Sequence, residues 1–172
     1  MKKLNVRAQK WLKTFHVLFA GLWVGAALSL TLKQFFINPS EGMELYGITS
    51  TLKFIDDFII IPGALGSLLT AFIYSIWTNW GWFKHKWIAV KWCINLYGVI
   101  FGTFWLGPWL NSLVPIAKDK GLEALSDPLF FHNRNMLMVW GSFQAATIVF
   151  AFSLSTLKPW KKKRRQNSGN SI

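Results

Sequence analysis

Cysteine and acidic residues are scarce in this chain of 172 residues. The one cysteine, Cys93, excludes an intramolecular disulfide framework, and its position in an apolar run predicts a small buried apolar side chain. Only seven Asp and Glu accompany 19 Lys and Arg, and charged residues make up 15% of the chain. Soluble domains carry about 25% charged residues, so this composition argues against an ordinary soluble domain.

Several enzyme motifs are also missing from the sequence. It contains no P-loop, no dinucleotide fingerprint and no nucleophile elbow. No histidines or cysteines stand at the HxxxH or CxxC spacing of common metal sites. The sequence therefore gives no basis for a nucleotide-dependent enzyme or for a metal site built on these motifs.

Charge is absent from four long stretches, at residues 14–32, 58–83, 92–117 and 135–157. A bilayer core about 30 Å thick needs roughly 20 apolar residues of helix, so each stretch is long enough to span it. We predict an all-α polytopic membrane protein, a bundle of four transmembrane helices at about 12–33, 57–80, 87–110 and 135–157. These form one domain, 1–160, followed by a basic disordered cytoplasmic tail at 161–172.

The basic residues are divided unequally between the two sides of this bundle. The side with both termini and the turn at 84–86 carries fourteen Lys and Arg and no acid, whereas the other side carries five and all seven acids. The positive-inside rule therefore predicts that both termini are cytoplasmic. The stretch "KPWKKKRR" directly follows a span, so we expect it to meet anionic lipid headgroups rather than nucleic acid.

The N-terminal segment and the two connections on the side with all seven acids each predict a local structure. "MKKLNVRAQKWLK" and the apolar run after it could form a signal peptide with "GAALS" as a weak cleavage site, but the length of the run favours an uncleaved helix. A Pro/Gly break and then "MELYGITSTLKFIDDF" predict a short interfacial helix before span two. "IAKDKGLEALSDP" predicts another short helix that stops before Pro128.

Small and polar residues recur at helical spacing in every span. Such residues concentrate where membrane helices touch, so we expect them to face the interior, a packing role that needs no function. The predicted stripes are His16, Ala20, Trp23 and Ala27; Gly63, Ser67, Thr70 and Tyr74; Lys91, Asn95, Gly98 and Gly102; and Gly141, Gln144 and Thr147. Gly21 and Gly25 form a GxxxG pair in span one.

His16 and Lys91 are ionisable residues just inside apolar spans. An ionisable group there is costly unless it is packed, paired or bound, although Lys91 could also snorkel to the interface. An imidazole and a cation beside Asn95 and small residues suit haem b, with His16 as iron ligand and Lys91 at a propionate. The other histidines fit less well, because His85 lies in the turn and His132 on the opposite side.

A resemblance supports the same two residues. "WLKTFHVLFAGLWVG" resembles the first-span pattern L-K-x-x-H-x-x-x-x-x-x-W-x-G of the membrane protoporphyrinogen oxidase HemJ and the related copper-resistance CopD-type proteins. "GWFKHKWIAVKW" resembles the HemJ stretch in which a tryptophan precedes an intramembrane lysine by four residues. The resemblance implies a b-haem ligand at His16 and an essential lysine at Lys91.

The stretches "DDFIIIPGALGSLLTAFIYSIWTNWGWFKHKWIAVKW" and "FGTFWLGPW" resemble an uncharacterised bacterial family of predicted four-span integral membrane proteins, and this match covers roughly residues 10–157. This resemblance implies the bacterial cytoplasmic membrane as location and brings no activity with it. The chain departs from HemJ-like proteins in span three, where Tyr97 and Gly98 precede only apolar and small residues. Because no second histidine lies at the depth of His16, the sequence does not predict a bis-histidine cytochrome.

Asp56 and Asp57 form the other constellation. They precede the predicted start of span two, where aspartates cap a helix and favour its dipole. Alternatively, they are paired carboxylates at the outer mouth of the bundle, approached by Arg134 or His132, for cation or proton entry.

Two function classes follow from these residues. One is a b-haem-binding membrane protein with a redox or haem- or porphyrin-handling role near the cytoplasmic leaflet. The other is a non-enzymatic membrane subunit or envelope factor without a cofactor, in which His16 and Lys91 only hydrogen-bond between helices and a homo-oligomer or another membrane partner is possible.

The charge asymmetry gives a testable topology. Reporter fusions at Ser126 and Gly169 are expected to report opposite sides of the membrane, with Gly169 cytoplasmic. Fusions that report both positions on the same side would contradict the four-span topology.

Overall fold

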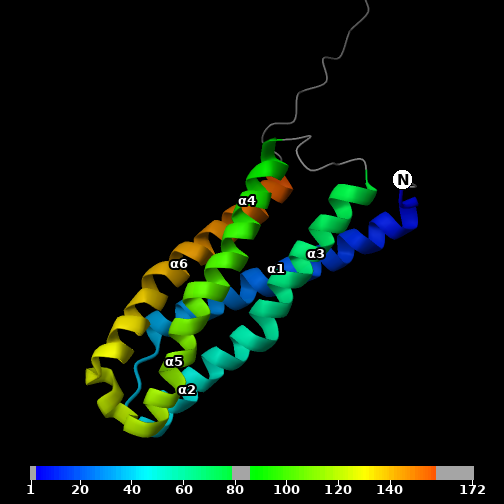
Figure 1. Cartoon of the computed structure of the whole chain (residues 1–172). Helices are drawn as coiled ribbons and strands as arrows, with labels where there is room; N and C mark the ends of the chain where they lie inside the picture. The colour runs from blue at the N-terminus through cyan, green and yellow to red at the C-terminus, as the bar shows by residue number, and fades with distance from the viewer. Residues whose placement is uncertain (1–2, 79–85, 158–172) are drawn as a thin grey trace, which may run out of the picture.

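The computed structural model of the chain describes residues 3–78 and 86–157, and helices dominate both ranges (Figure 1). Four helices are long and apolar enough to cross a membrane: Val6–Phe36, Gly42–Trp77, Trp87–Ser126 and Pro128–Ser155. The predicted all-α bundle of four transmembrane helices is therefore confirmed. Leu69 and Phe104 on its surface are 61% and 67% exposed, as expected of side chains that face lipid.

Two of the long helices consist of several segments. α1 (Val6–Phe36) and α6 (Pro128–Leu157) are uninterrupted. The second long helix comprises α2 (Gly42–Ile55), the π-helical turn η1 (Asp56–Ile60) and α3 (Ile61–Trp77). The third comprises α4 (Lys86–Phe101), the π-helical turn η2 (Gly102–Leu106), α5 (Gly107–Lys120) and the 3₁₀ turn η3 (Gly121–Ser126).

This arrangement corrects the predicted connections. No separate interfacial helix precedes span two, because α2 continues through η1 into α3. The second predicted short helix is not separate either, because α5 runs through Lys120 into the 3₁₀ turn η3, but the helix does end before Pro128 as expected. The turn at 79–85 and the tail at 161–172 lie outside the described residues.

Prolines explain both π-helical turns. Pro62 and Pro108 are each the second residue after a π turn, and proline has no N–H to donate to the carbonyl four residues earlier. The preceding residue instead donates across five residues, from Ile61 N–H to the Asp56 carbonyl and from Gly107 N–H to the Gly102 carbonyl. The helix thus widens by one residue and continues instead of breaking.

The two ends of the bundle differ in charge. The start of α1, with Arg7, Lys10 and Lys13, lies beside the end of α3, and we call this the basic end (Figure 1). The opposite end, with α2, α5 and η3, is here the acidic end. The 36 residues of Gly42–Trp77 are about 54 Å long, well beyond a hydrocarbon core of about 30 Å, so part of this helix extends past the bilayer.

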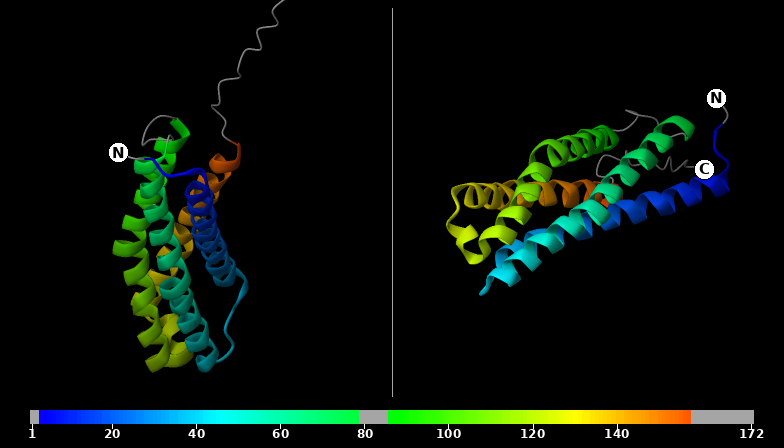
Figure 2. Two further views of the ribbon diagram at one scale, coloured as in Figure 1. Left: turned by 90° about the vertical axis from the view of Figure 1, so that its right-hand side faces the viewer. Right: turned by 60° about the horizontal axis from the view of Figure 1, so that its bottom comes forward.

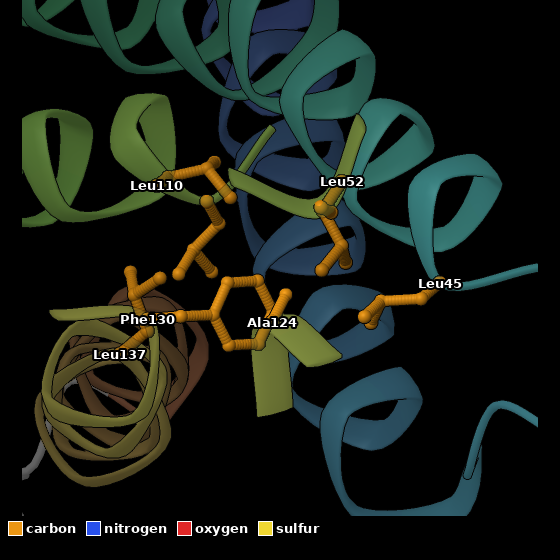
Figure 3. Packing of buried hydrophobic residues seen from close by; sticks show 8 residues of the cluster. Leu45, Leu52, Leu110, Ala124, Phe130 and Leu137 are labelled. Atoms are coloured by element: carbon orange, nitrogen blue, oxygen red, sulfur yellow. The ribbon is translucent and has the colours of Figure 1, made fainter. Parts of the chain in front are cut away.

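The acidic end has its own hydrophobic core. It is built by α2, α5, η3 and the first turns of α6, and Phe130 lies at its centre (Figure 3). The buried residues of this cluster are Leu45, Leu52, Leu110, Leu113, Ala117, Ala124, Phe130 and Leu137. The parts of the two interrupted helices near the acidic end are therefore held by ordinary side-chain packing.

Asp127 fixes the start of α6. Its Oδ1 atom accepts hydrogen bonds from the N–H groups of Leu129 and Phe130 at 2.9 and 3.0 Å, and Lys120 donates to its other oxygen. The hydrogen bond from Lys120 and those from the backbone lower the pKa of the Asp127 carboxyl. The cap sets the direction in which α6 returns towards the basic end.

Near the basic end the helices form two pairs. α1 packs closely against α3 and α4 packs against α6, whereas α3 and α4 touch only sparsely. Figures 1 and 2 show these pairs diverging towards the end that carries the N-terminus. Contact between α1 and α6 joins the pairs along the opposite side.

Two glycines of α3 permit its close approach to α1. A Cβ atom on Gly63 would lie 3.0 Å from the Trp23 nitrogen and 3.1 Å from the Phe19 carbonyl oxygen. A Cβ atom on Gly66 would lie 2.5 Å from the Phe19 ring. By contrast, Gly21 and Gly25 are exposed and nothing lies within 4 Å of a Cβ atom there, so the prediction that this GxxxG pair faces the interior is wrong.

This difference predicts unequal effects of the same substitution. Gly63→Ala is expected to lower the thermal unfolding temperature in detergent, because its methyl group meets backbone atoms that cannot move independently. Gly25→Ala is the matched control and is expected to leave that temperature unchanged or to raise it. Equal unfolding temperatures for the two variants would contradict the close packing of α1 and α3.

Candidate functional site

His16 lies between α1 and α3 and is half-buried. Its Nδ1 atom lies 2.8 Å from Thr70 Oγ1. The single hydroxyl proton of Thr70 has an acceptor 2.7 Å away, the Gly66 carbonyl, so Oγ1 is left to accept. The proton of the neutral ring is then on Nδ1, and Nε2 carries a lone pair.

The surroundings of the ring hold it in place. Tyr74 meets the imidazole edge-on, with 6.1 Å between ring centroids, and the Tyr74 hydroxyl donates to the Gln9 carbonyl at 3.2 Å. The Leu4 N–H donates to the Trp77 carbonyl at 3.0 Å. These bonds attach the start of α1 to the end of α3, so His16 is positioned by two helices rather than one.

Lys91 lies in the first turns of α4 and reaches the neighbouring helix. Its ammonium donates to Ser155 Oγ of α6 at 2.6 Å, so it crosses between the helices of the second pair. Asn95, one turn further along α4, is half-buried and makes no hydrogen bond with the described residues.

The predicted second wall of the His16 site is filled by a side chain. Trp23 is only 2% exposed, and its ring carbons would lie 3.1 Å from a Cβ atom on Gly98. Trp23 packs with Ala64 and Ile148 at the centre of the bundle. The inward stripe of span one is therefore confirmed at Trp23, but the Gly98 face is covered by indole and offers no slot for a macrocycle.

Beyond Trp23, towards the acidic end, lies a cavity of about 470 Å³. It is bounded by α1, both π turns, the start of α3, α4, the start of α5 and α6. Asp56, Asp57, Asn111 and Gln144 contribute polar groups to its wall, whereas neither His16 nor Lys91 is among the lining residues. The two predicted sets of site residues are therefore separate: Asp56 and Asp57 line the cavity, whereas His16 and Lys91 do not.

Asp56 and Asp57 do not start a helix, so their predicted role as caps is wrong. They lie within the continuous helix, in η1. The Asp57 carboxylate forms an ion pair with Lys53 one turn earlier, whereas the Asp56 carboxylate makes no side-chain hydrogen bond with the described residues. The negative charge of these carboxylates must therefore be balanced by neighbouring side chains or a ligand, because no free N–H groups of a helix start are available there.

Three further predictions are settled by exposure and position. Cys93 is exposed on α4, so the expectation that it is buried is wrong. His132 is exposed at the start of α6, on the opposite end from His16 as predicted. His85 lies outside the described residues, and the described part of the chain contains no group of three His, Cys, Asp or Glu that could hold a metal ion.

Sequence reasoning missed the partners of the candidate residues. It placed Thr70 and Gln144 on inward faces, but it did not pair Thr70 with His16 or connect Gln144 to the aspartates. It also missed both π turns, although "FIIIP" and "FWLGP" carry a proline in the middle of an apolar run. Comparison with known proteins adds no assignment, because no family model, no curated protein and no solved structure matches the chain.

Proposed function

We propose that this membrane protein binds haem b at its basic end, with His16 Nε2 as the iron ligand, and that it has a redox or porphyrin-handling role there. The observation that carries the proposal is the hydrogen bond between His16 Nδ1 and Thr70. Ligating histidines generally donate their other ring N–H to a fixed acceptor, which sets the tautomer and the orientation of the ring.

The side chains at the basic end fit haem b only in part. One anchored imidazole and the Lys91 ammonium on α4 match an iron ligand and a propionate partner in kind. The Gly98 face does not fit, because Trp23 covers it. When bound with one protein ligand, haem supplies an iron with an open coordination position.

The residues of the chain have distinct tasks in this proposal. Thr70 keeps the proton on Nδ1 and so keeps the Nε2 lone pair available. Lys91 holds a carboxylate of the porphyrin, and its bond to Ser155 aims the ammonium. The attachment of α1 to α3 at Gln9 and Leu4 keeps the His16 ring from turning towards lipid.

The proposal predicts a Soret band in protein purified from haem-sufficient cells. His16→Ala is expected to abolish the band, whereas the matched control His132→Ala, at the acidic end, leaves it unchanged. Lys91→Ala is expected to retain the band but to release haem faster to apomyoglobin, because a propionate contact is electrostatic. A native protein without a Soret band would overturn the proposal.

Thr70 acts as a positioning residue and has its own comparison in that experiment. Thr70→Val removes the acceptor for Nδ1–H at nearly constant volume and is expected to weaken haem retention by about tenfold or more. Thr70→Ser restores the hydroxyl and is expected to restore retention. Equal loss in both variants would indicate a packing role for Thr70.

A second candidate function is a membrane subunit without a cofactor. It is favoured by the exposed face of α1, where Gly21, Gly25 and Ser29 follow one another at intervals of four residues. Small residues at this spacing let another helix approach closely. The partner in this case is a second copy of the chain or another membrane helix.

This alternative predicts association through α1. A Gly21→Leu, Gly25→Leu double variant is expected to lose cross-linked oligomers in native membranes. An unchanged cross-linking pattern in the glycine variant would exclude this face as an interface.

A further inference from the structure

The cavity behind Trp23 is not used by the proposed haem site, and its chemistry points to a ligand of its own. We propose that it binds an amphiphilic organic cation, a protonated amine on an apolar body, whose N–H groups donate to Asp56 and Gln144. The inference is independent of haem binding at His16.

Charge is the first argument. No lysine, arginine or histidine lines the cavity, whereas two carboxylates do. Asp57 is paired with Lys53, which leaves Asp56 as the carboxylate without a hydrogen-bond donor among the described residues. A carboxylate in such a setting is stabilised by a cation that brings its own donors.

Gln144 supplies an independent second argument. It lines the cavity and is only 6% exposed. Its Nε2 atom donates to the Gly98 carbonyl at 3.1 Å, but its Oε1 atom is buried and has no donor among the described residues. An amide oxygen only accepts, so this group also requires an N–H donor or a cation.

The remaining wall selects an organic body rather than a bare metal ion. Most of the other lining residues are apolar, among them Ile60, Ala64 and Leu106, and Trp23 also belongs to the wall. The described residues hold no cluster of three metal-binding side chains. A volume of about 470 Å³ is within the range of small-molecule sites.

The cavity opens sideways from the bundle. Ile61 and Leu65 on one side, and Thr103 and Pro108 on the other, line it and are also exposed. These residues belong to the two interrupted helices, whose α3 and α4 segments touch only sparsely. A ligand with an apolar body therefore enters from the lipid phase, between the two π turns.

The test uses the full chain in phosphatidylcholine nanodiscs and isothermal titration calorimetry. The probes are phenethylammonium, the neutral 2-phenylethanol and the anionic phenylpropionate, which share an aromatic body. Phenethylammonium is expected to bind at least about tenfold more tightly than the alcohol, and the carboxylate not at all. Equal binding of the cation and the alcohol by the native chain would overturn the proposal.

Two substitutions localise the site. Asp56→Asn and Gln144→Leu are each expected to weaken phenethylammonium binding by about tenfold or more. Asp119→Asn is the matched control, an exposed carboxylate outside the cavity, and is expected to bind like the native chain. Native affinity in a folded Asp56→Asn variant, judged by circular dichroism, would overturn the assignment.

These outcomes are separable from those for haem. Calorimetry of the organic probes does not depend on the Soret band, and if a cavity variant fails to fold, the probe series on the native chain decides the question. Loss of phenethylammonium binding in His16→Ala, with native binding in Asp56→Asn, would relocate the cation site to the basic end and overturn this inference.

Discussion

A proline in a membrane helix leaves a carbonyl without its backbone donor, and hydrocarbon offers no water to replace it. The two interrupted helices resolve this constraint in the same way, by one π-helical turn before Pro62 and another before Pro108. Each turn widens the helix at the level of the cavity, and the first presents Asp56 and Asp57 there. The cavity is therefore a consequence of how the backbone hydrogen bonds are satisfied.

The close contact between α1 and α3 positions His16. Without side chains at Gly63 and Gly66, the two backbones come close enough for Trp23 to enter the centre and for His16 to meet Thr70. A single interhelical hydrogen bond then selects the ring tautomer. Trp23 separates the two sites, so the imidazole and the aspartates have different neighbours although both lie inside one bundle.

Much of the fold was predictable from the sequence because hydrophobic length is a strong signal. Uncharged runs of at least 19 residues located the four spans, and the stripe through Trp23 was correctly assigned to the interior. The limits of span two were not predictable in this way, since α2 carries Glu44 and Lys53 and yet continues as helix beyond the bilayer. Charge marks where lipid ends, but it does not mark where a helix ends.

The orientation of small residues was also beyond sequence reasoning. Glycine is equally compatible with a helix contact and with a lipid-facing surface, so periodicity alone could not distinguish Gly63, which is buried, from Gly25, which is exposed. Cys93 was misplaced for the same reason, because a small apolar side chain has little preference between protein interior and hydrocarbon. Pairings such as His16 with Thr70 depend on helix register, which no single span encodes.

The splayed arrangement of the helix pairs has a mechanical consequence. The pairs are joined at the acidic end, where the cluster around Phe130 packs α2, α5 and α6 together, and again at the level of Trp23, Ala64 and Ile148. They separate from there towards the basic end. The two helix pairs are thus two arms that are joined in one part of the bundle and separated at the basic end. With arms of roughly 26 Å, the length of α3, a rotation of about 5° at the joined part moves the tips by roughly 2 Å. A small rotation at the joined part would therefore change the distance between the α1–α3 tip and the α4–α6 tip.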